Sequence, residues 1–154
     1  MKRIYAQEHW CVDCGRCEVA CKVFHSKSKD HVKAYFWESP QPQSRIRVEG
    51  DASLSAAVNC RHCREPLCVE ACISGAMTKD AVTGIVSLDE KSCVGCGTCV
   101  SVCPFGCVHV THDAGAGLAH KCDLCRDGIG QIGEPRCVAV CPNRALLYCE
   151  SEEA

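Results

Sequence analysis

The chain has 154 residues, and 18 of them are cysteine, so the 47% hydrophobic content falls to roughly 35% once cysteine is set aside. A domain of this size with so little hydrocarbon needs metal or covalent cross-links for stability. The formal net charge of −2 comes with dispersed Lys and Arg, which excludes a basic stripe for nucleic acid. No apolar run reaches the length of about 18 residues that a membrane helix requires, so we expect no membrane insertion.

The first ten residues, MKRIYAQEHW, contain an expected strand at Arg3–Ala6 but no apolar segment or cleavage site of a secretory signal. This indicates a cytoplasmic protein. Disulfides are rare in the cytoplasm, so the cysteine density predicts metal ligands.

Sixteen cysteines form four quartets in chain order. The first and third share the spacing C-x2-C-x2-C-x3-C, and the second and fourth widen the middle gap to four and eleven residues. The third and fourth quartets are each followed by proline, Pro104 and Pro142. In order, the quartets are Cys11, Cys14, Cys17, Cys21; Cys60, Cys63, Cys68, Cys72; Cys93, Cys96, Cys99, Cys103; and Cys122, Cys125, Cys137, Cys141.

This spacing is typical of 4Fe-4S sites. Three thiolates on a tight loop bind three corners of one cluster, and the fourth cysteine of a quartet serves the neighbouring cluster, as in two-cluster bacterial ferredoxins. Quartets therefore work in pairs, and four of them predict four 4Fe-4S clusters. Structural zinc is the alternative, but it favours two well-separated ligand pairs and matches this spacing poorly.

The segment Lys22–Lys33, KVFHSKSKDHVK, carries four lysines and two histidines against one aspartate. It is either a solvated loop or a docking patch for an acidic partner face or an anionic carrier. Trp37 and the PQPQ stretch that follows indicate an irregular surface segment, which is a second candidate partner contact.

Strand signals suggest which quartets pair. Ala76–Thr78 and Ile85–Leu88 flank a polar turn that leads into the third quartet, so the second and third quartets form one unit. Its outer strands are expected at Leu54–Val58 and Val108–Thr111. By elimination, the first and fourth quartets form the other unit, in which Arg3–Ala6 pairs with Ala145–Tyr148 and the termini meet.

The expected fold class is α+β, with two bacterial-ferredoxin-like (βαβ)2 units that each hold two 4Fe-4S clusters and are related by pseudo-twofold repetition. One unit is expected at residues 51–111, and the other at residues 1–50 together with 112–154. The acidic tail ESEEA is expected to fray, and self-association is left open.

Three motifs carry a family resemblance: CVDCGRCEVACK at 11–22, CRHCREPLCVEAC at 60–72 and CVGCGTCVSVCPFG at 93–106. They resemble the four-cluster electron-transfer subunits of molybdenum and tungsten oxidoreductases, such as the DMSO reductase iron-sulfur subunit. They also resemble the ferredoxin-like subunits that serve carbon monoxide dehydrogenase and hydrogenases. The chain departs modestly from ferredoxins at Lys22 and Ile73, where proline is common.

The resemblance implies four ligand sets: Cys11, Cys14, Cys17 with Cys141; Cys21 with Cys122, Cys125, Cys137; Cys60, Cys63, Cys68 with Cys103; and Cys72 with Cys93, Cys96, Cys99. Cys107 and Cys149 lie outside every quartet and are expected to be buried thiols that pack as small hydrophobic groups. His62 and His120 are near ligand cysteines, and we expect exposed loop histidines there rather than groups that tune a cluster.

No catalytic triad, paired carboxylates, P-loop or GxGxxG is recognisable. An all-cysteine ligand set also leaves no open iron position for a substrate. We therefore expect a non-catalytic electron-transfer subunit that relays single electrons between a catalytic oxidoreductase subunit and another redox carrier. The favoured partners are tungsten aldehyde oxidoreductase and carbon monoxide dehydrogenase, with formate dehydrogenase and hydrogenase open. An iron-sulfur carrier or assembly scaffold is the alternative.

Overall fold

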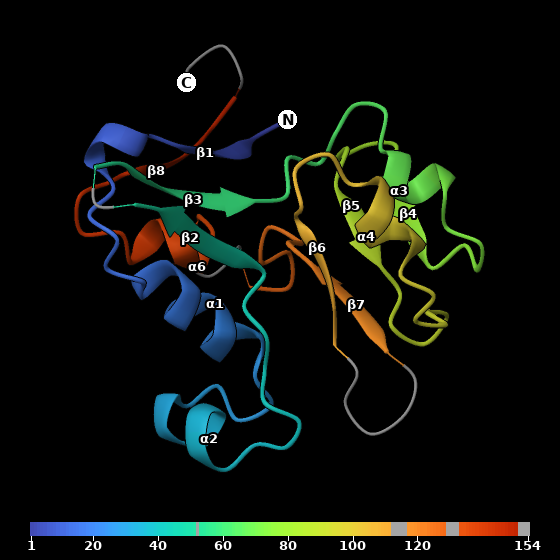
Figure 1. The fold of residues 1–154 in the computed structure, drawn as a ribbon, viewed down its shortest axis with the longest axis horizontal. Coiled ribbons are helices and arrows are strands. Elements are labelled where there is room, and N and C mark those ends of the chain that lie inside the picture. Colours follow the sequence, from blue (N-terminus) through green and yellow to red (C-terminus); the bar gives the residue numbers. More distant parts are fainter. Residues whose placement is uncertain (52, 112–116, 129–132, 151–154) are drawn as a thin grey trace. The chain divides into compact units, whose positions relative to one another are not determined.

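The protein is a small mixed α/β chain, described here by a computed structural model for residues 1–51, 53–111, 117–128 and 133–150 (Figure 1). Most of the acidic tail, residues 151–154, lies outside this range. The elements are β1 (Arg3–Ala6), the 3-10 helix η1 (Glu8–Trp10), α1 (Arg16–His25), α2 (His31–Phe36), β2 (Ile46–Gly50), β3 (Ser55–Asn59), α3 (Leu67–Glu70), β4 (Met77–Lys79), β5 (Val86–Leu88), α4 (Thr98–Val102), β6 (Val108–Thr111), β7 (Leu118–Lys121), α6 (Arg136–Ala139) and β8 (Leu146–Cys149).

The chain divides into two units, one nested inside the other in sequence. The first unit combines Met1–Asn59 with Leu124–Ala154, and the second is the continuous segment Cys60–Asp123. The first unit therefore contains the whole first quartet and most of the fourth, and the second unit contains the second and third quartets. These boundaries differ from the expected 51 and 112 because of two strand pairings that are described below.

In the first unit, the two ends of the chain pair as expected. β1 and β8 are antiparallel, with Arg3 opposite Cys149 and Ala6 opposite Leu146. The Met1 amino group forms an ion pair with Glu150, which brings the termini of the described chain together. Buried Ile4 and Leu146 give this two-stranded sheet its apolar face.

The strand expected at 54–58 forms, but its assignment as an outer strand of the unit at 51–111 is wrong. β3 instead forms a hairpin with β2 in the first unit, with Gly50 opposite Ser55. The turn is fixed by Asp51, whose Oδ1 accepts hydrogen bonds from the amides of Ser53 at 2.7 Å and Leu54 at 3.2 Å. A local turn of this kind costs little chain entropy, which explains why this strand pairs with its neighbour in sequence.

The second unit contains two antiparallel hairpins. β4 pairs with β5, with Met77 opposite Leu88, which confirms the hairpin before the third quartet. β6 pairs with β7, with Val108 opposite Lys121. The buried core of this unit is small, and cysteines of the second and third quartets pack against it; its members are Met77, Val86, Cys99, Val108 and Ala119.

Two kinds of helix start recur along the chain. α1 and α4 each follow a glycine in the left-handed conformation, Gly15 with φ +65° and Gly97 with φ +75°. α3 and α6 each follow an extended proline, Pro66 and Pro135. Each unit thus holds one helix of each kind. Within the described residues, no helix has the length and apolar character needed to cross a membrane.

Candidate metal centres

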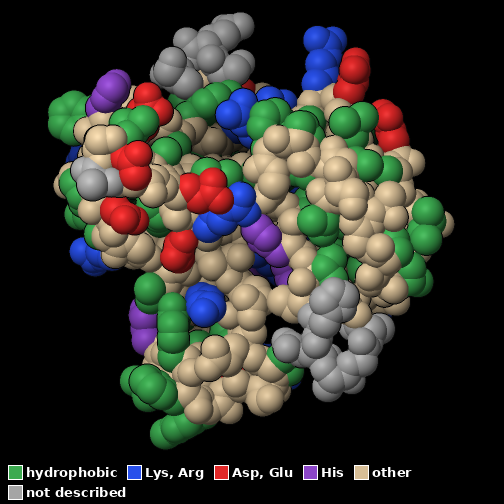
Figure 2. Space-filling model, viewed as in Figure 1, with side chains coloured by type: hydrophobic (Ala, Val, Ile, Leu, Met, Phe, Trp, Pro, Cys, Tyr) green, Lys and Arg blue, Asp and Glu red, His purple; other side chains and the backbone are tan. Residues whose placement is uncertain are grey.

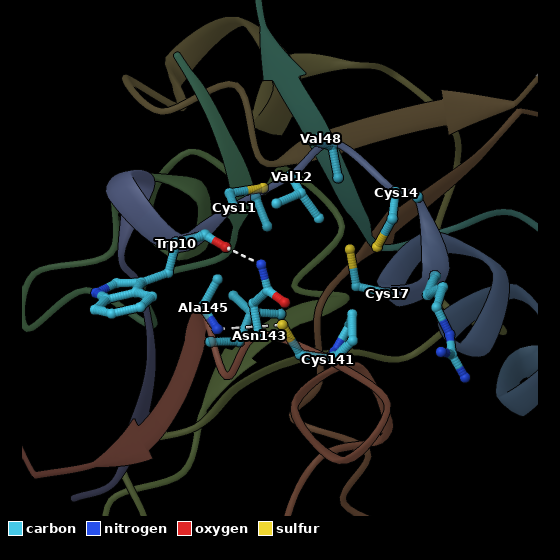
Figure 3. A pocket seen from close by; sticks show the side chains of 14 residues that line it. Trp10, Cys11, Val12, Cys14, Cys17, Val48, Cys141, Asn143 and Ala145 are labelled. Carbon is cyan, nitrogen blue, oxygen red and sulfur yellow. Dashed lines mark hydrogen bonds between the residues drawn. The ribbon is translucent and has the colours of Figure 1, made fainter. Parts of the chain in front are cut away.

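One pocket gathers cysteines from opposite ends of the sequence (Figure 3). Cys11, Cys14 and Cys17 of the first quartet line it together with Cys141 of the fourth. The Asn143 side chain donates to the Trp10 carbonyl oxygen at 3.2 Å, which ties the segment after Cys141 to the segment before Cys11. The β1–β8 pairing thus positions two distant loops around one site.

A second pocket, inside the second unit, gathers the fourth cysteine of the second quartet with three from the third. Cys72, Cys93, Cys96 and Cys99 line it, and Met77 and Ala119 of the small core form part of its wall. The Thr98 hydroxyl lies 3.4 Å from Cys96 Sγ, and this contact is the main cause of the lowered pKa of Cys96.

A third group surrounds Cys68 in the second unit. Burial raises the pKa of the Cys68 thiol to about 11, and the thiols of Cys60, Cys63 and Cys103 act on it in the same direction. The positive charge of Lys121 opposes them. These four cysteines are therefore electrostatic neighbours.

The remaining four cysteines are all buried: Cys21, Cys122, Cys125 and Cys137. Cys21 on α1 and Cys137 on α6 belong to two helices of the first unit that pack against each other. Cys125 belongs to the same unit, in a left-handed conformation with φ +52°, and Cys122 falls in the second unit.

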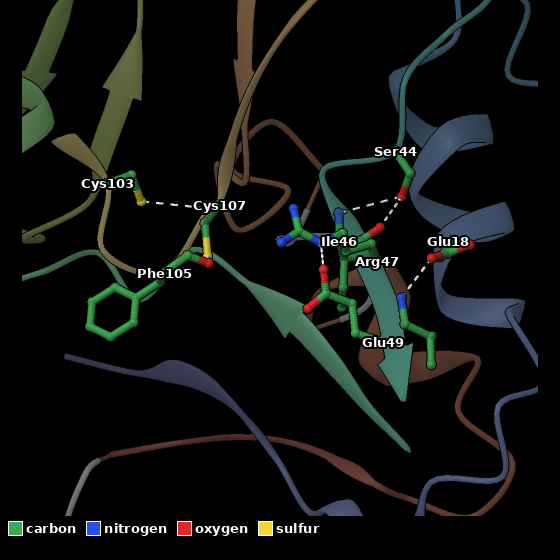
Figure 4. A network of polar contacts seen from close by, with 9 residues as sticks. Glu18, Ser44, Ile46, Arg47, Glu49, Cys103, Phe105 and Cys107 are labelled. Atoms are coloured by element: carbon green, nitrogen blue, oxygen red, sulfur yellow. Dashed lines mark hydrogen bonds and ion pairs between the residues drawn. The ribbon is translucent and has the colours of Figure 1, made fainter. Parts of the chain in front are cut away.

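Backbone amides are directed at the sulfur of the fourth cysteine in each quartet. Cys103 Sγ accepts from the amide of Cys107 at 3.4 Å (Figure 4), and Cys141 Sγ accepts from Ala145 at 3.2 Å. The other two contacts are Met77 N to Cys72 Sγ at 3.4 Å and Arg45 N to Cys21 Sγ at 3.2 Å. Hydrogen bonds to ligand sulfur stabilise its negative charge and are a main determinant of cluster potential.

The loops that carry these amides are held by local contacts. The Glu18 carboxylate on α1 accepts from the amide of Val48 on β2 at 2.6 Å, and this bond joins the helix that carries Cys21 to the hairpin that follows Arg45 (Figure 4). His25 Nδ1, on the same helix, lies 3.6 Å from Cys21 Sγ.

The thiol chemistry fits an iron-sulfur cluster. Burial raises the pKa of Cys17 to about 11, so this thiol holds its proton at neutral pH until a metal displaces it. Soft thiolate ligands with amide donors toward sulfur are the donor set that iron-sulfur clusters prefer.

Two buried polar side chains were not predicted correctly from the sequence. His62, expected in an exposed loop, is fully buried, and its Nδ1 accepts from the amide of Val86 at 3.0 Å. Lys121 is also buried, with 2% of its surface exposed, and no sequence pattern predicted its burial. His120 is half-buried, with Nε2 at 2.9 Å from the Thr111 hydroxyl.

The two cysteines outside the quartets differ in burial. Cys107 is buried as expected, with Sγ donating to the Phe105 carbonyl oxygen at 3.2 Å, whereas Cys149 at the end of β8 is only half-buried. The Cys107 amide donates to the cysteine four residues earlier, Cys103. The amide of Ala145 donates in the same way to Cys141, four residues before it, so this spacing is the sequence signal for both contacts.

Comparison with known proteins identifies the family. Residues 53–151 match the model of the 4Fe-4S dicluster domain, and residues 8–23 match that of a 4Fe-4S binding domain. The chain is 37% identical over 153 residues to an iron-sulfur protein of Rhodospirillum rubrum, covering 93% of this chain and 79% of the relative.

Two further relatives have names that describe electron transfer. The electron transport protein HydN of Escherichia coli K12 is 36% identical over 163 residues, covering 94% of this chain and 85% of the relative. The thiosulfate reductase electron transfer subunit PhsB of Salmonella typhi is 35% identical over 159 residues, covering 96% of this chain and 74% of the relative. With its 18 cysteines, this chain binds multiple 4Fe-4S clusters and belongs to the 4Fe-4S dicluster family of iron-sulfur electron-transport proteins.

Proposed function

We propose that the chain relays single electrons through four 4Fe-4S clusters between a catalytic oxidoreductase subunit and another redox carrier. The observation that carries this proposal is that cysteines from different quartets line common pockets, with backbone amides directed at their sulfur atoms. The proposed ligand sets are Cys11, Cys14, Cys17, Cys141; Cys21, Cys122, Cys125, Cys137; Cys60, Cys63, Cys68, Cys103; and Cys72, Cys93, Cys96, Cys99.

When bound, a 4Fe-4S cluster supplies one-electron redox chemistry. The part of the protein is to hold thiolates at fixed positions, to donate amide hydrogen bonds to their sulfur atoms and to limit access of water. Burial of Cys17, Cys21, Cys99 and Cys137 serves the last purpose. Since every proposed ligand is a cysteine, the sets would leave no open iron position for a substrate, and the chain acts as an electron-transfer subunit rather than an enzyme.

The partner is proposed to be a catalytic subunit with molybdenum or tungsten chemistry, an aldehyde or formate oxidoreductase, or a carbon monoxide dehydrogenase. The sequence resemblance favours these classes, and a relative named as the electron transfer subunit of thiosulfate reductase supports a catalytic partner in general. The cysteine density favours a reducing compartment, which we take to be the cytoplasm.

The proposed docking surface is the α2 face, defined as Val32, Lys33, Phe36 and Trp37. Phe36 is 79% exposed and Trp37 is 73% exposed, which is unusual for side chains of this size. Figure 2 shows hydrophobic side chains gathered at the lower left, where α2 lies in Figure 1. Residues 22–33 contain lysines at 22, 27, 29 and 33 and one acidic residue, Asp30, so this segment is positively charged. The complementary partner surface is therefore an apolar depression with an acidic rim.

The α2 face is held by specific contacts. The Asp30 side chain caps α2 by accepting from the amides of Val32 at 3.0 Å and Lys33 at 2.9 Å. Glu38 accepts from the amides of Lys27 at 3.0 Å and Ser28 at 2.8 Å, which closes the preceding loop onto the end of the helix. A surface fixed in this way needs little ordering on binding.

Cluster content tests the proposal directly. Anaerobically purified protein is expected to contain about sixteen iron and sixteen sulfide per chain, and Cys141→Ser to lose about four of each. Cys149→Ser is the matched control, because Cys149 is in the same segment but outside the quartets, and it is expected to keep full content. Wild-type protein with about eight iron, or with zinc, would contradict the proposal. Rapid transfer of clusters to an apo-protein would instead support the carrier alternative.

A further inference from the structure

Lys121 is a buried cation within the second unit. It lies at the end of β7 with only 2% of its surface exposed. Its Nζ donates to the carbonyl oxygen of Cys122 at 2.8 Å and also to that of Val86. Burying a lysine is unfavourable unless its charge is compensated, so this position needs a physical reason.

Val86 links Lys121 to a second buried polar group. Its carbonyl oxygen accepts from Lys121, and its amide donates to Nδ1 of His62 at 3.0 Å. Because Nδ1 accepts, the His62 ring proton is on Nε2. His62 is fully buried, and its own amide donates to Cys60 Sγ at 3.4 Å. Val86 therefore contacts Lys121 through its carbonyl oxygen and, through its amide, His62 in the loop that carries Cys60.

Cysteines of the second unit pack beside the core residue that Lys121 contacts. The Val86 side chain belongs to the small core against which cysteines of both proposed ligand sets of this unit pack, Cys68 and Cys103 of one and Cys72 and Cys93 of the other. Lys121 acts electrostatically on Cys68, where its positive charge favours the thiolate. Neither contact of its Nζ is with an acidic side chain, since both acceptors are backbone carbonyl oxygens.

We propose that Lys121 is a fixed positive charge that raises the reduction potential of the cluster bound by Cys60, Cys63, Cys68 and Cys103. This inference rests on the proposed ligand sets. Reduction adds one negative charge to the cluster, and a nearby cation favours the more negative state. In a medium with an effective dielectric constant of about 20, a unit charge at about 10 Å changes such an equilibrium by about tenfold.

Three substitutions separate charge from hydrogen bonding. Lys121→Met removes both, Lys121→Gln keeps a donor without the charge, and Lys121→Arg keeps the charge. Lys79→Met is the matched control, because Lys79 is in the same unit and its Nζ also donates to a backbone carbonyl oxygen, that of Arg64 at 2.5 Å, but in an exposed contact. The readouts are iron and sulfide content and a redox titration with dithionite followed by electron paramagnetic resonance.

We expect Lys121→Met and Lys121→Gln to make reduction of one cluster at least tenfold less favourable, a shift of about −59 mV for a one-electron couple. Lys121→Arg and Lys79→Met are expected to leave every midpoint near its wild-type value. Full iron content in Lys121→Gln with no shift in any midpoint potential would overturn the inference. Loss of iron in all three Lys121 variants would also overturn it, because the residue would then serve packing alone. Failure of the ligand sets themselves would appear differently, as low iron content in the wild-type protein.

Discussion

Gly95 offers a test of how tightly the third quartet is built. It lies between Cys93 and Cys96 with φ +68°, and a Cβ placed there would be 2.1 Å from the carbonyl oxygen of Gly117. Gly97, two residues later, has φ +75° and nothing within 4 Å of its Cβ position. The two glycines share a loop and a backbone conformation but differ in the space around them, and Gly97 also precedes α4.

The expected costs follow from this difference. An alanine in the left-handed region costs about 1–2 kcal/mol at either position. At Gly95 the backbone at Gly117 must also move by roughly 1 Å to reach ordinary contact, which adds about 1–3 kcal/mol as overpacking does in a well-packed core. Gly117 leads directly into β7, the strand that ends at Lys121, so this shift reaches the core of the second unit.

The measurement compares Gly95→Ala with Gly97→Ala during guanidinium unfolding under anaerobic conditions, followed by the visible absorbance of the bound clusters. The additional 1–3 kcal/mol corresponds to about a 5- to 150-fold larger unfolding equilibrium constant, so Gly95→Ala is expected to lose absorbance at clearly lower denaturant. Gly15→Ala, at the corresponding open position of the first quartet, is a second control. Equal midpoints for the Gly95 and Gly97 variants would refute the close approach to Gly117.

Two further predictions concern the α2 face and the segment that precedes it. Replacing Lys27, Lys29 and Lys33 with glutamate is expected to slow electron transfer from the partner enzyme most strongly at low salt, with unchanged cluster spectra; a rate independent of salt in both proteins would assign these lysines to solvent. Asp30→Ala is expected to increase hydrogen exchange in residues 31–36, whereas Asp30→Asn retains the cap. Amide hydrogen bonds from Lys33 and Val32 lower the pKa of Asp30. The Asp30 cap therefore stabilises α2 fully above the unfolded-state pKa of this carboxyl, and the stabilisation is lost as the pH falls through the lower folded-state pKa. Exchange in α2 that is unaffected by Asp30→Ala would contradict the capping role.

Short-range patterns predicted much of the second unit. The hairpin of β4 and β5 was predictable because two apolar runs flank a polar turn, and the β1–β8 pairing followed from assigning the outer quartets to each other. The β2–β3 hairpin was missed, although Gly50-Asp51 is a recognisable turn signal between two runs of strand-forming residues. Lys22–His25, expected in a loop, form the last turn of α1.

Burial of single polar residues was harder to predict. Nothing in the local sequence distinguishes Lys121 from the exposed lysines, because its burial depends on the Val86 carbonyl oxygen 35 residues earlier in the chain. His62 is likewise buried by a contact with Val86, 24 residues later. Spacing patterns predict candidate metal ligands, whereas the groups that surround them come from tertiary contacts that no spacing encodes.

The nested order of the two units has a consequence for folding. The second unit is continuous over Cys60–Asp123, so its hairpins and cysteine groups close short loops. The first unit requires β1 to find β8 across nearly the whole chain, and its pocket requires Cys141 beside Cys11, Cys14 and Cys17. Contacts between distant residues carry a larger loop-closure entropy and form later. The second unit is therefore the part of the chain that can form during synthesis, and the first unit must wait until the C-terminal strand has been made.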